Sequence, residues 1–169
     1  LPYNLPIGAE NDFRGIVDLL TQKAFVWQGD ETGAKFVEEE VPADMVDLVK
    51  THREKLVEEI CGTDDTLMEK FLEGEEPSVE ELKAALRKAV ILKKIVPVMA
   101  GSSLRNKGVQ PMLDAVIEYL PSPLDIPSLE GKDPKTEEPK SFDNTKDAAL
   151  GALAFKIQVD PHVGRLTYV

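Results

Sequence analysis

The chain has 169 residues, 42% of them hydrophobic, which excludes a disordered chain and fits one domain, alone or with pieces of its neighbours. Its 20 basic and 31 acidic residues give a net charge of −11, so DNA or RNA is a poor partner and a basic protein surface a better one, unless the acidity only aids solubility. The single cysteine, Cys61, excludes internal disulfides and indicates a cytoplasmic protein, and no apolar run approaches the roughly 20 residues that cross a bilayer, which predicts no membrane partner.

The first part of the chain has the composition of short strands. Residues 15–20 and 23–27 carry β-branched and aromatic side chains, and residues 29–33 supply turn-forming residues. Apolar and polar residues alternate again over residues 34–38. This pattern predicts an antiparallel meander or hairpin.

Three amphipathic helices are expected next. Pro42 suits the opening of the first, in which apolar residues recur every three or four positions. Thr63 or Asp64 could cap the second, and Ser78 and Glu81 have the spacing of a capping box that starts the third. The helices are predicted over residues 43–60, up to residue 72, and over residues 79–93.

The composition changes at Ile95. Residues 95–100 form a short continuous apolar run, which is typical of a strand buried on both faces of a parallel sheet. A loop over residues 101–107 and an apolar helical pattern over residues 108–120 follow. Strand, loop and helix in this order predict the last unit of a doubly wound α/β domain.

The end of the chain is predicted to be a linker followed by strands. Residues 121–148 are rich in proline and charged residues, and residues 150–159 and 165–169 have strand composition. Two strands alone do not make a stable sheet, so we expect them to be poorly satisfied or swapped between copies. Since the N-terminus also has neither a signal-peptide pattern nor an initiator methionine, we expect a segment excised from a longer protein.

Several blocks of the sequence resemble translational GTPases of the elongation factor G family. Ser102, Ser103 and Leu104 match the family's fifth guanine-nucleotide motif, a tight turn whose backbone N–H contacts the guanine carbonyl. The family usually has alanine where this chain has Ser103, a change that a backbone contact should tolerate. The more specific blocks are residues 5–10, 70–76, 109–127 and 154–166, which occur in family order.

The resemblance implies how the chain is divided. Residues 1–11 would belong to the GTPase domain, residues 12–94 to an inserted α+β subdomain with antiparallel strands and three helices, and residues 95–120 to the end of the GTPase domain. Residues 121–148 would be a linker, and residues 149–169 the start of a β-barrel second domain. The expected fold class is therefore α/β. The intact parent would hydrolyse GTP with Mg²⁺ and promote translocation on the ribosome.

The phosphate-binding motifs of a GTPase are missing from this sequence. It has no GxxxxGK[ST] loop and no DxxG in a context that could hold Mg²⁺. Residues 106–109 begin like the base-reading NKxD motif, but Val109 stands where the guanine-pairing aspartate is needed. Because phosphoryl transfer depends on positioning and charge neutralisation, we expect no catalytic residue, no cofactor and no metal in this chain alone.

The first predicted helix carries a row of exposed acidic positions opposite its apolar stripe. In the family, a helix of the inserted subdomain resembles this one and contacts the C-terminal domain of the ribosomal stalk protein. The resemblance therefore implies that the acidic row is a partner-binding surface, whose negative charge would attract a basic patch on the partner and speed their encounter. The alternative is a solvated face paired locally with nearby lysines and Arg53. The acidic row comprises Asp47, Thr51, Glu54 and Glu58.

Other polar residues are given structural roles. His52 lies on the apolar stripe, Cys61 has no second cysteine, and His162 stands in a turn without other metal ligands. Arg105 and Lys107 could touch nucleotide or ribosomal RNA in the parent. No convergent nucleophile, base or metal set supports an unrelated enzyme, so the alternatives are a stand-alone acidic protein-binding module and a paralogous ribosome-protection GTPase.

Overall fold

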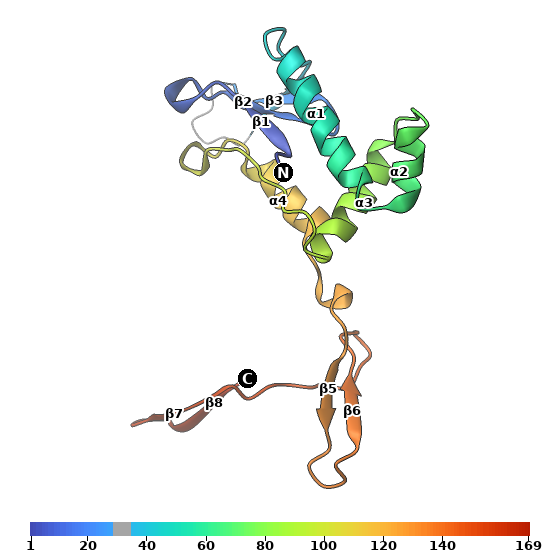
Figure 1. Ribbon diagram of the computed structural model, residues 1–169. Coiled ribbons are helices and arrows are strands. Elements are labelled where there is room, and N and C mark those ends of the chain that lie inside the picture. Colours follow the sequence, from blue (N-terminus) through green and yellow to red (C-terminus); the bar gives the residue numbers. More distant parts are fainter. Residues whose placement is uncertain (29–34) are drawn as a thin grey trace. The chain divides into compact units, whose positions relative to one another are not determined.

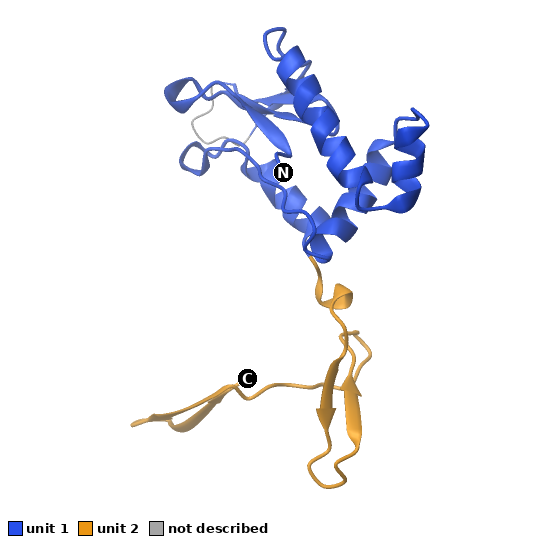
Figure 2. Cartoon of the chain, viewed as in Figure 1, with its two compact units in different colours: residues 1–120 blue, residues 121–169 orange. Residues whose placement is uncertain are grey.

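The chain divides into two units in the computed structural model, residues 1–120 and residues 121–169 (Figure 1; Figure 2). The structure describes residues 1–28 and 35–169. Within these residues the protein is mixed α/β, with four α-helices and antiparallel sheets, which agrees with the expected α/β class. The turn expected over residues 29–33 lies outside the described residues.

A four-stranded antiparallel meander forms one side of unit 1. Its strands are β1 (Asn4–Ile7), β2 (Gly15–Asp18), β3 (Lys23–Val26) and β4 (Val37–Glu39), in the order β1-β2-β3-β4. The predicted meander is therefore confirmed, with β1 as an additional edge strand. The register places Val17 opposite both Leu5 and Ala24, so one buried residue from each of three strands meets in the core.

Three helices follow the sheet as predicted: α1 (Val46–Cys61), α2 (Asp65–Leu72) and α3 (Val79–Ile91). The capping box is confirmed, because Glu81 N donates to Ser78 Oγ at 3.2 Å and Ser78 N donates to Glu81 Oε2 at 2.9 Å. Asp64 caps α2 by accepting from Leu67 N at 3.4 Å. Helix α1 begins three residues later than expected, since residues 43–45 form a turn in which Met45 N donates to the Pro42 carbonyl.

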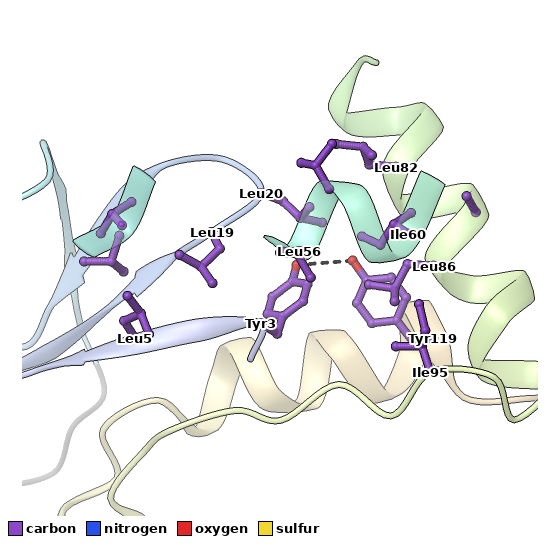
Figure 3. Packing of buried hydrophobic residues seen from close by; sticks show 14 of the residues in the cluster. Tyr3, Leu5, Leu19, Leu20, Leu56, Ile60, Leu82, Leu86, Ile95 and Tyr119 are labelled. Atoms are coloured by element: carbon purple, nitrogen blue, oxygen red, sulfur yellow. Dashed lines mark hydrogen bonds between the residues drawn. The ribbon is translucent and has the colours of Figure 1, made fainter. Parts of the chain in front are cut away.

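The hydrophobic core joins the sheet to the buried faces of the helices (Figure 3). Leu56 and Ile60 of α1 pack with Leu82 and Leu86 of α3, and burial of each such side chain contributes about 2 kcal/mol. The N-terminal segment reaches α4 (Val109–Tyr119) through Tyr3, whose hydroxyl lies 3.2 Å from that of Tyr119. Burial raises the pKa of both tyrosines, so the pair remains neutral.

The segment after α3 corrects the prediction of a buried parallel strand over residues 95–100. It forms a single parallel bridge between Val98 and Pro2, in which Tyr3 N donates to the Val98 carbonyl at 2.9 Å and Val98 N to the Leu1 carbonyl at 2.8 Å. Ile95 is buried, but Val96 is 71% exposed and Val98 57% exposed. A strand of a parallel sheet is normally covered on both faces, and among the described residues this segment lacks that cover and pairs along one edge only.

Unit 2 contains two hairpins, the first of which lies within the predicted linker. The first, β5 (Leu129–Lys132) with β6 (Pro139–Phe142), corrects the prediction of an irregular linker over residues 121–148. In the connecting turn, Asp133 Oδ1 accepts a hydrogen bond from Lys135 N at 2.8 Å. The hairpin was not predicted because proline and charged residues are common in irregular segments as well.

The second hairpin pairs β7 (Lys156–Asp160) with β8 (Gly164–Tyr168). Strand β7 begins later than the predicted residue 150, and the expected turn is confirmed, because Asp160 Oδ1 accepts from the backbone N–H groups of His162 and Val163. Among the described residues these strands pair only with each other and leave Ile157 and Val159 exposed. This agrees with the expectation that they are poorly satisfied.

Candidate functional site

The acidic row lies along the solvent face of α1. Asp47, Thr51, Glu54 and Glu58 are all exposed, and the helical period places them opposite the buried side chains of the same helix, including Leu56. The Thr51 hydroxyl donates to the Asp47 carbonyl at 2.9 Å, a contact within α1 itself. The row therefore presents three carboxylates, with Thr51 engaged by its own helix.

Arg53 does not neutralise this row. Its guanidinium donates to the carbonyls of Leu19 at 2.9 Å and Leu20 at 2.6 Å, and it forms a salt bridge with Glu76 at 2.5 Å. In the part of the chain that the structure describes, no salt bridge joins Asp47, Glu54 or Glu58 to a basic side chain. The carboxylates of the row therefore face solvent without local salt bridges, an arrangement that both alternatives left by the sequence share: a partner-binding surface and a solvated helix face.

A groove of about 410 Å³ borders the row where α1 faces the end of α2. Basic and acidic side chains both line the groove: Lys50 and Arg53, and Glu54 and Glu75. Phe71 adds an apolar side chain to its wall. Glu54 belongs to both the groove and the row, so a partner that contacts the row at this helical position also meets the groove.

The Ser102–Leu104 loop forms a tight turn before α4. Ser102 and Lys107 pair across its base, with Ser102 N donating to the Lys107 carbonyl at 2.8 Å and Lys107 N to the Ser102 carbonyl at 3.0 Å. Residues 103–105 form one turn of 3₁₀-helix, η2 (Ser103–Arg105). Gly108 closes the loop with φ +83°, and an added Cβ there would meet the Gly101 Cα at 3.1 Å.

This turn leaves two backbone donors available. Among the described residues, the N–H groups of Ser103 and Leu104 have no backbone or side-chain acceptor, and the Leu104 side chain is 95% exposed. A cavity of about 270 Å³ adjoins the loop and is lined by Met99, Gly101, Ser102, Ser103, Lys107 and Met112. Ser103, which lines this cavity, therefore has a backbone N–H without an acceptor among the described residues.

Arg105 and Lys107, the candidate nucleotide or RNA contacts, form hydrogen bonds within the protein. Arg105 donates to Asn11, and the Lys107 ammonium donates to the Phe13 carbonyl at 3.2 Å. Sequence reasoning missed these contacts because their acceptors are 94 positions away. These positive charges hold the loop against the segment between β1 and β2.

The remaining predicted residues occupy structural positions. His52 is half-buried on α1, and Cys61 is fully buried, where desolvation raises the pKa of its thiol. His162 is exposed in the turn between β7 and β8. Within residues 1–28 and 35–169, no group of three or more histidine, cysteine, aspartate or glutamate side chains could hold a metal ion.

None of the described helices is both long and apolar enough to span a membrane.

Comparison with known proteins gives a solved structure similar to this chain and no family assignment. No protein-family model matches the sequence. The chain is similar to a protein of Thermus thermophilus whose crystal structure is known, with 32% sequence identity and a TM-score of 0.68. The match covers 99% of this chain and 22% of that protein, so the chain spans about a fifth of its length. The similarity therefore extends over both units of the chain.

Proposed function

We propose that the chain is a segment of a translational GTPase of the elongation factor G family, and that α1 within it docks the C-terminal domain of the ribosomal stalk protein. The observation that carries the docking proposal is the unpaired acidic row on α1. Three exposed carboxylates at helical spacing create a negative field that attracts a basic surface and accelerates encounter. Arg53 of the same helix is occupied by backbone carbonyls and by Glu76, and it forms no salt bridge with the row.

Two observations support the GTPase part of the proposal. The Ser102–Leu104 loop offers free backbone N–H groups beside a small cavity, as a contact to the guanine carbonyl requires. Residues 1–3 also pair in parallel with residues 96–98, which suits neighbouring strands of a doubly wound sheet that has a subdomain inserted between them. In the intact parent, GTP phosphates and Mg²⁺ would be held by motifs outside this sequence.

An exposed apolar surface further supports membership of a larger domain. A groove of about 420 Å³ between residues 93–99 and α4 is lined by apolar side chains that include Val96, Met112 and Val116. Beside it, Ile117 is 78% exposed. Contiguous apolar surface of this kind marks an interface, and in the proposed parent the rest of the GTPase sheet would cover it. A stand-alone acidic module would explain the row on α1 but not this surface or the loop.

An amide-shift NMR titration with the stalk protein's C-terminal domain tests the docking proposal. We expect shifts at Asp47, Thr51, Glu54 and Glu58 that diminish between low and moderate salt, because exposed charges are screened beyond about 10 Å at 0.1 M salt.

Two charge-reversal variants test whether the shifts depend on the acidic row itself. Asp47→Lys, Glu54→Lys and Glu58→Lys together should abolish the shifts. The same reversal at Glu69, Glu73 and Glu80, which are exposed on or next to α2 and α3, should leave them intact. Absence of shifts in the folded wild-type chain would overturn the docking role, and equal loss in both variants would reduce the row to a general charge effect.

A further inference from the structure

The loop that carries Ser102, Ser103 and Leu104 is fastened to a distant part of the chain by two basic side chains. The Arg105 guanidinium donates to the backbone carbonyl of Asn11 at 3.2 Å and to its side-chain Oδ1 at 2.9 Å. The Lys107 ammonium donates to the Phe13 carbonyl at 3.2 Å. Figure 1 shows the two loops, before β2 and before α4, on the same side of unit 1.

The segment that accepts these hydrogen bonds, residues 11–13, is anchored at its end by Phe13. Phe13 is buried with Ile16 and Trp27 in a cluster of its own. Arg14 N donates to the Ile7 carbonyl and Trp27 N to the Arg14 carbonyl, each at 3.0 Å, so the backbone next to Phe13 is tied to two strands. Lys107 therefore connects the loop to backbone that the β-sheet holds, and Arg105 connects it to Asn11, an exposed residue of the preceding 3₁₀ turn η1 (Glu10–Asp12).

The other restraints on the loop are local: Arg105 N donates to the Ser102 carbonyl and Asn106 N to the Ser103 carbonyl, each at 3.2 Å. The bridge between Ser102 and Lys107 closes its base, but the Leu104 side chain is almost fully exposed and packs against nothing that could fix the turn. Asn106 ends the turn in a left-handed conformation with φ +51°, which asparagine tolerates better than most other residues. Arg105 directly follows Ser103 and Leu104, whose N–H groups are free, so its two bonds to Asn11 restrain the part of the loop that packing leaves free.

We propose that Arg105 and Asn11 form a latch that sets the conformation of the Ser102–Leu104 loop and thereby the affinity for a guanine base. This inference rests on the proposed function of the loop. Both are positioning residues: the side chain of Arg105 points to Asn11, and the base would meet the backbone of Ser103 and Leu104. Lysine cannot replace Arg105 fully, because the guanidinium fork reaches two acceptors at once and an ammonium does not reproduce that planar geometry.

Hydrogen exchange in the 169-residue chain tests the latch without nucleotide. We expect Arg105→Ala to accelerate exchange of the hydrogen-bonded amides of Ser102 and Lys107 roughly three- to tenfold, with Arg105→Lys in between. Arg165→Ala, an exposed arginine on β8, is the matched control and should change neither amide. Unchanged exchange in Arg105→Ala would overturn the latch.

Binding of fluorescent GDP to the full-length parent tests the link to the base. Arg105→Ala and Asn11→Leu should each raise the GDP Kd roughly three- to tenfold, and the double variant should be no worse than the weaker single variant, because both remove the same contact. In GTP hydrolysis, KM should rise while kcat at saturating GTP stays unchanged, a split that general destabilisation does not produce.

The outcomes separate the two proposals. If the wild-type parent binds no GDP, the proposed function fails, and the guanine role of the latch fails with it. If the wild-type parent binds GDP and both single variants bind it equally well, only the latch is overturned. Additive losses in the double variant would also overturn it, since Arg105 and Asn11 would then act separately.

Discussion

At the scale of single residues, Arg53 connects α1 to two other parts of unit 1. Its guanidinium is held by the carbonyls of Leu19 and Leu20, next to the turn between β2 and β3, and by Glu76 after α2. The side chain is only 12% exposed, so these carbonyls have little access to water that could replace it. Arg53 thus fixes α1 next to the β2–β3 turn and pairs with Glu76, not with the acidic row.

We predict that Arg53→Met lowers the free energy of unfolding by about 2 to 3 kcal/mol, because it leaves two backbone carbonyls without their charged donor. Urea denaturation followed by circular dichroism measures the change. Lys55→Met on the exposed face of α1 is the control and should stay within about 0.5 kcal/mol of the wild type. Equal effects of the two substitutions would show that Arg53 acts only through helix propensity.

The same residue shows what the sequence could not reveal. Helical spacing placed Arg53 near the acidic row, and the structure finds its partners in backbone carbonyls 33 and 34 positions earlier. Every residue has a backbone carbonyl, whatever its side chain. The sequence therefore does not show which carbonyl accepts a hydrogen bond from a distant arginine. The exposure of Asp47 and Glu58, by contrast, followed directly from helical periodicity.

At the scale of elements, predictions succeeded where local chemistry fixes the structure. The capping box at Ser78 and the helical periods of α1, α3 and α4 depend on neighbours within one or two turns. The sequence analysis did not predict β1, which contains Pro6 and is accommodated as an edge strand of the sheet. The prediction failed for residues 95–100, where the apolar composition matches a central strand but the described chain provides a single pairing partner.

The capping box gives a prediction on helix stability. Ser78→Ala should lower the free energy of unfolding by about 1 kcal/mol, because the N–H of Glu81 loses its acceptor at the start of α3. Thermal or urea denaturation detects a change of this size. Ser141→Ala, on the exposed face of β6, is the control and should have no measurable effect on the unfolding of unit 1.

The pH dependence of stability gives a second prediction for this element. Lys70 and the Ser78 backbone N–H lower the pKa of Glu81 to about 2, from an ordinary value of 4.5. Because the pKa is depressed in the folded state, the stabilisation is complete above the unfolded value and is lost as the pH falls from 4.5 toward 2. Glu81→Gln should therefore flatten the decline of the urea midpoint in this range, whereas Glu80→Gln, an exposed neighbour, should not.

At the scale of the whole molecule, the chain combines a strong negative charge with a localised apolar surface. The net charge of −11 makes copies of the chain repel each other. The groove beside α4 and the exposed Val96 and Ile117 favour burial against another surface. In the proposed parent the apolar surface is covered within one protein, while the acidic row on α1 remains free for its partner.

These opposing forces predict salt-dependent association of the isolated chain. At low salt, charge repulsion should keep it monomeric, and at about 0.5 M salt, where screening reaches only a few ångströms, the apolar surface should drive concentration-dependent association. Sedimentation velocity measures this as a rise in mass. Val96→Lys with Ile117→Lys should keep the chain monomeric at high salt, because Val96 lines the groove and Ile117 is an exposed residue of α4 next to the lining residue Val116. Leu72→Lys with Val163→Lys adds the same charge at exposed positions on α2 and next to β8, so it should leave the association intact if the groove beside α4 is the contact. Association that both double variants abolish equally would instead depend on net charge alone.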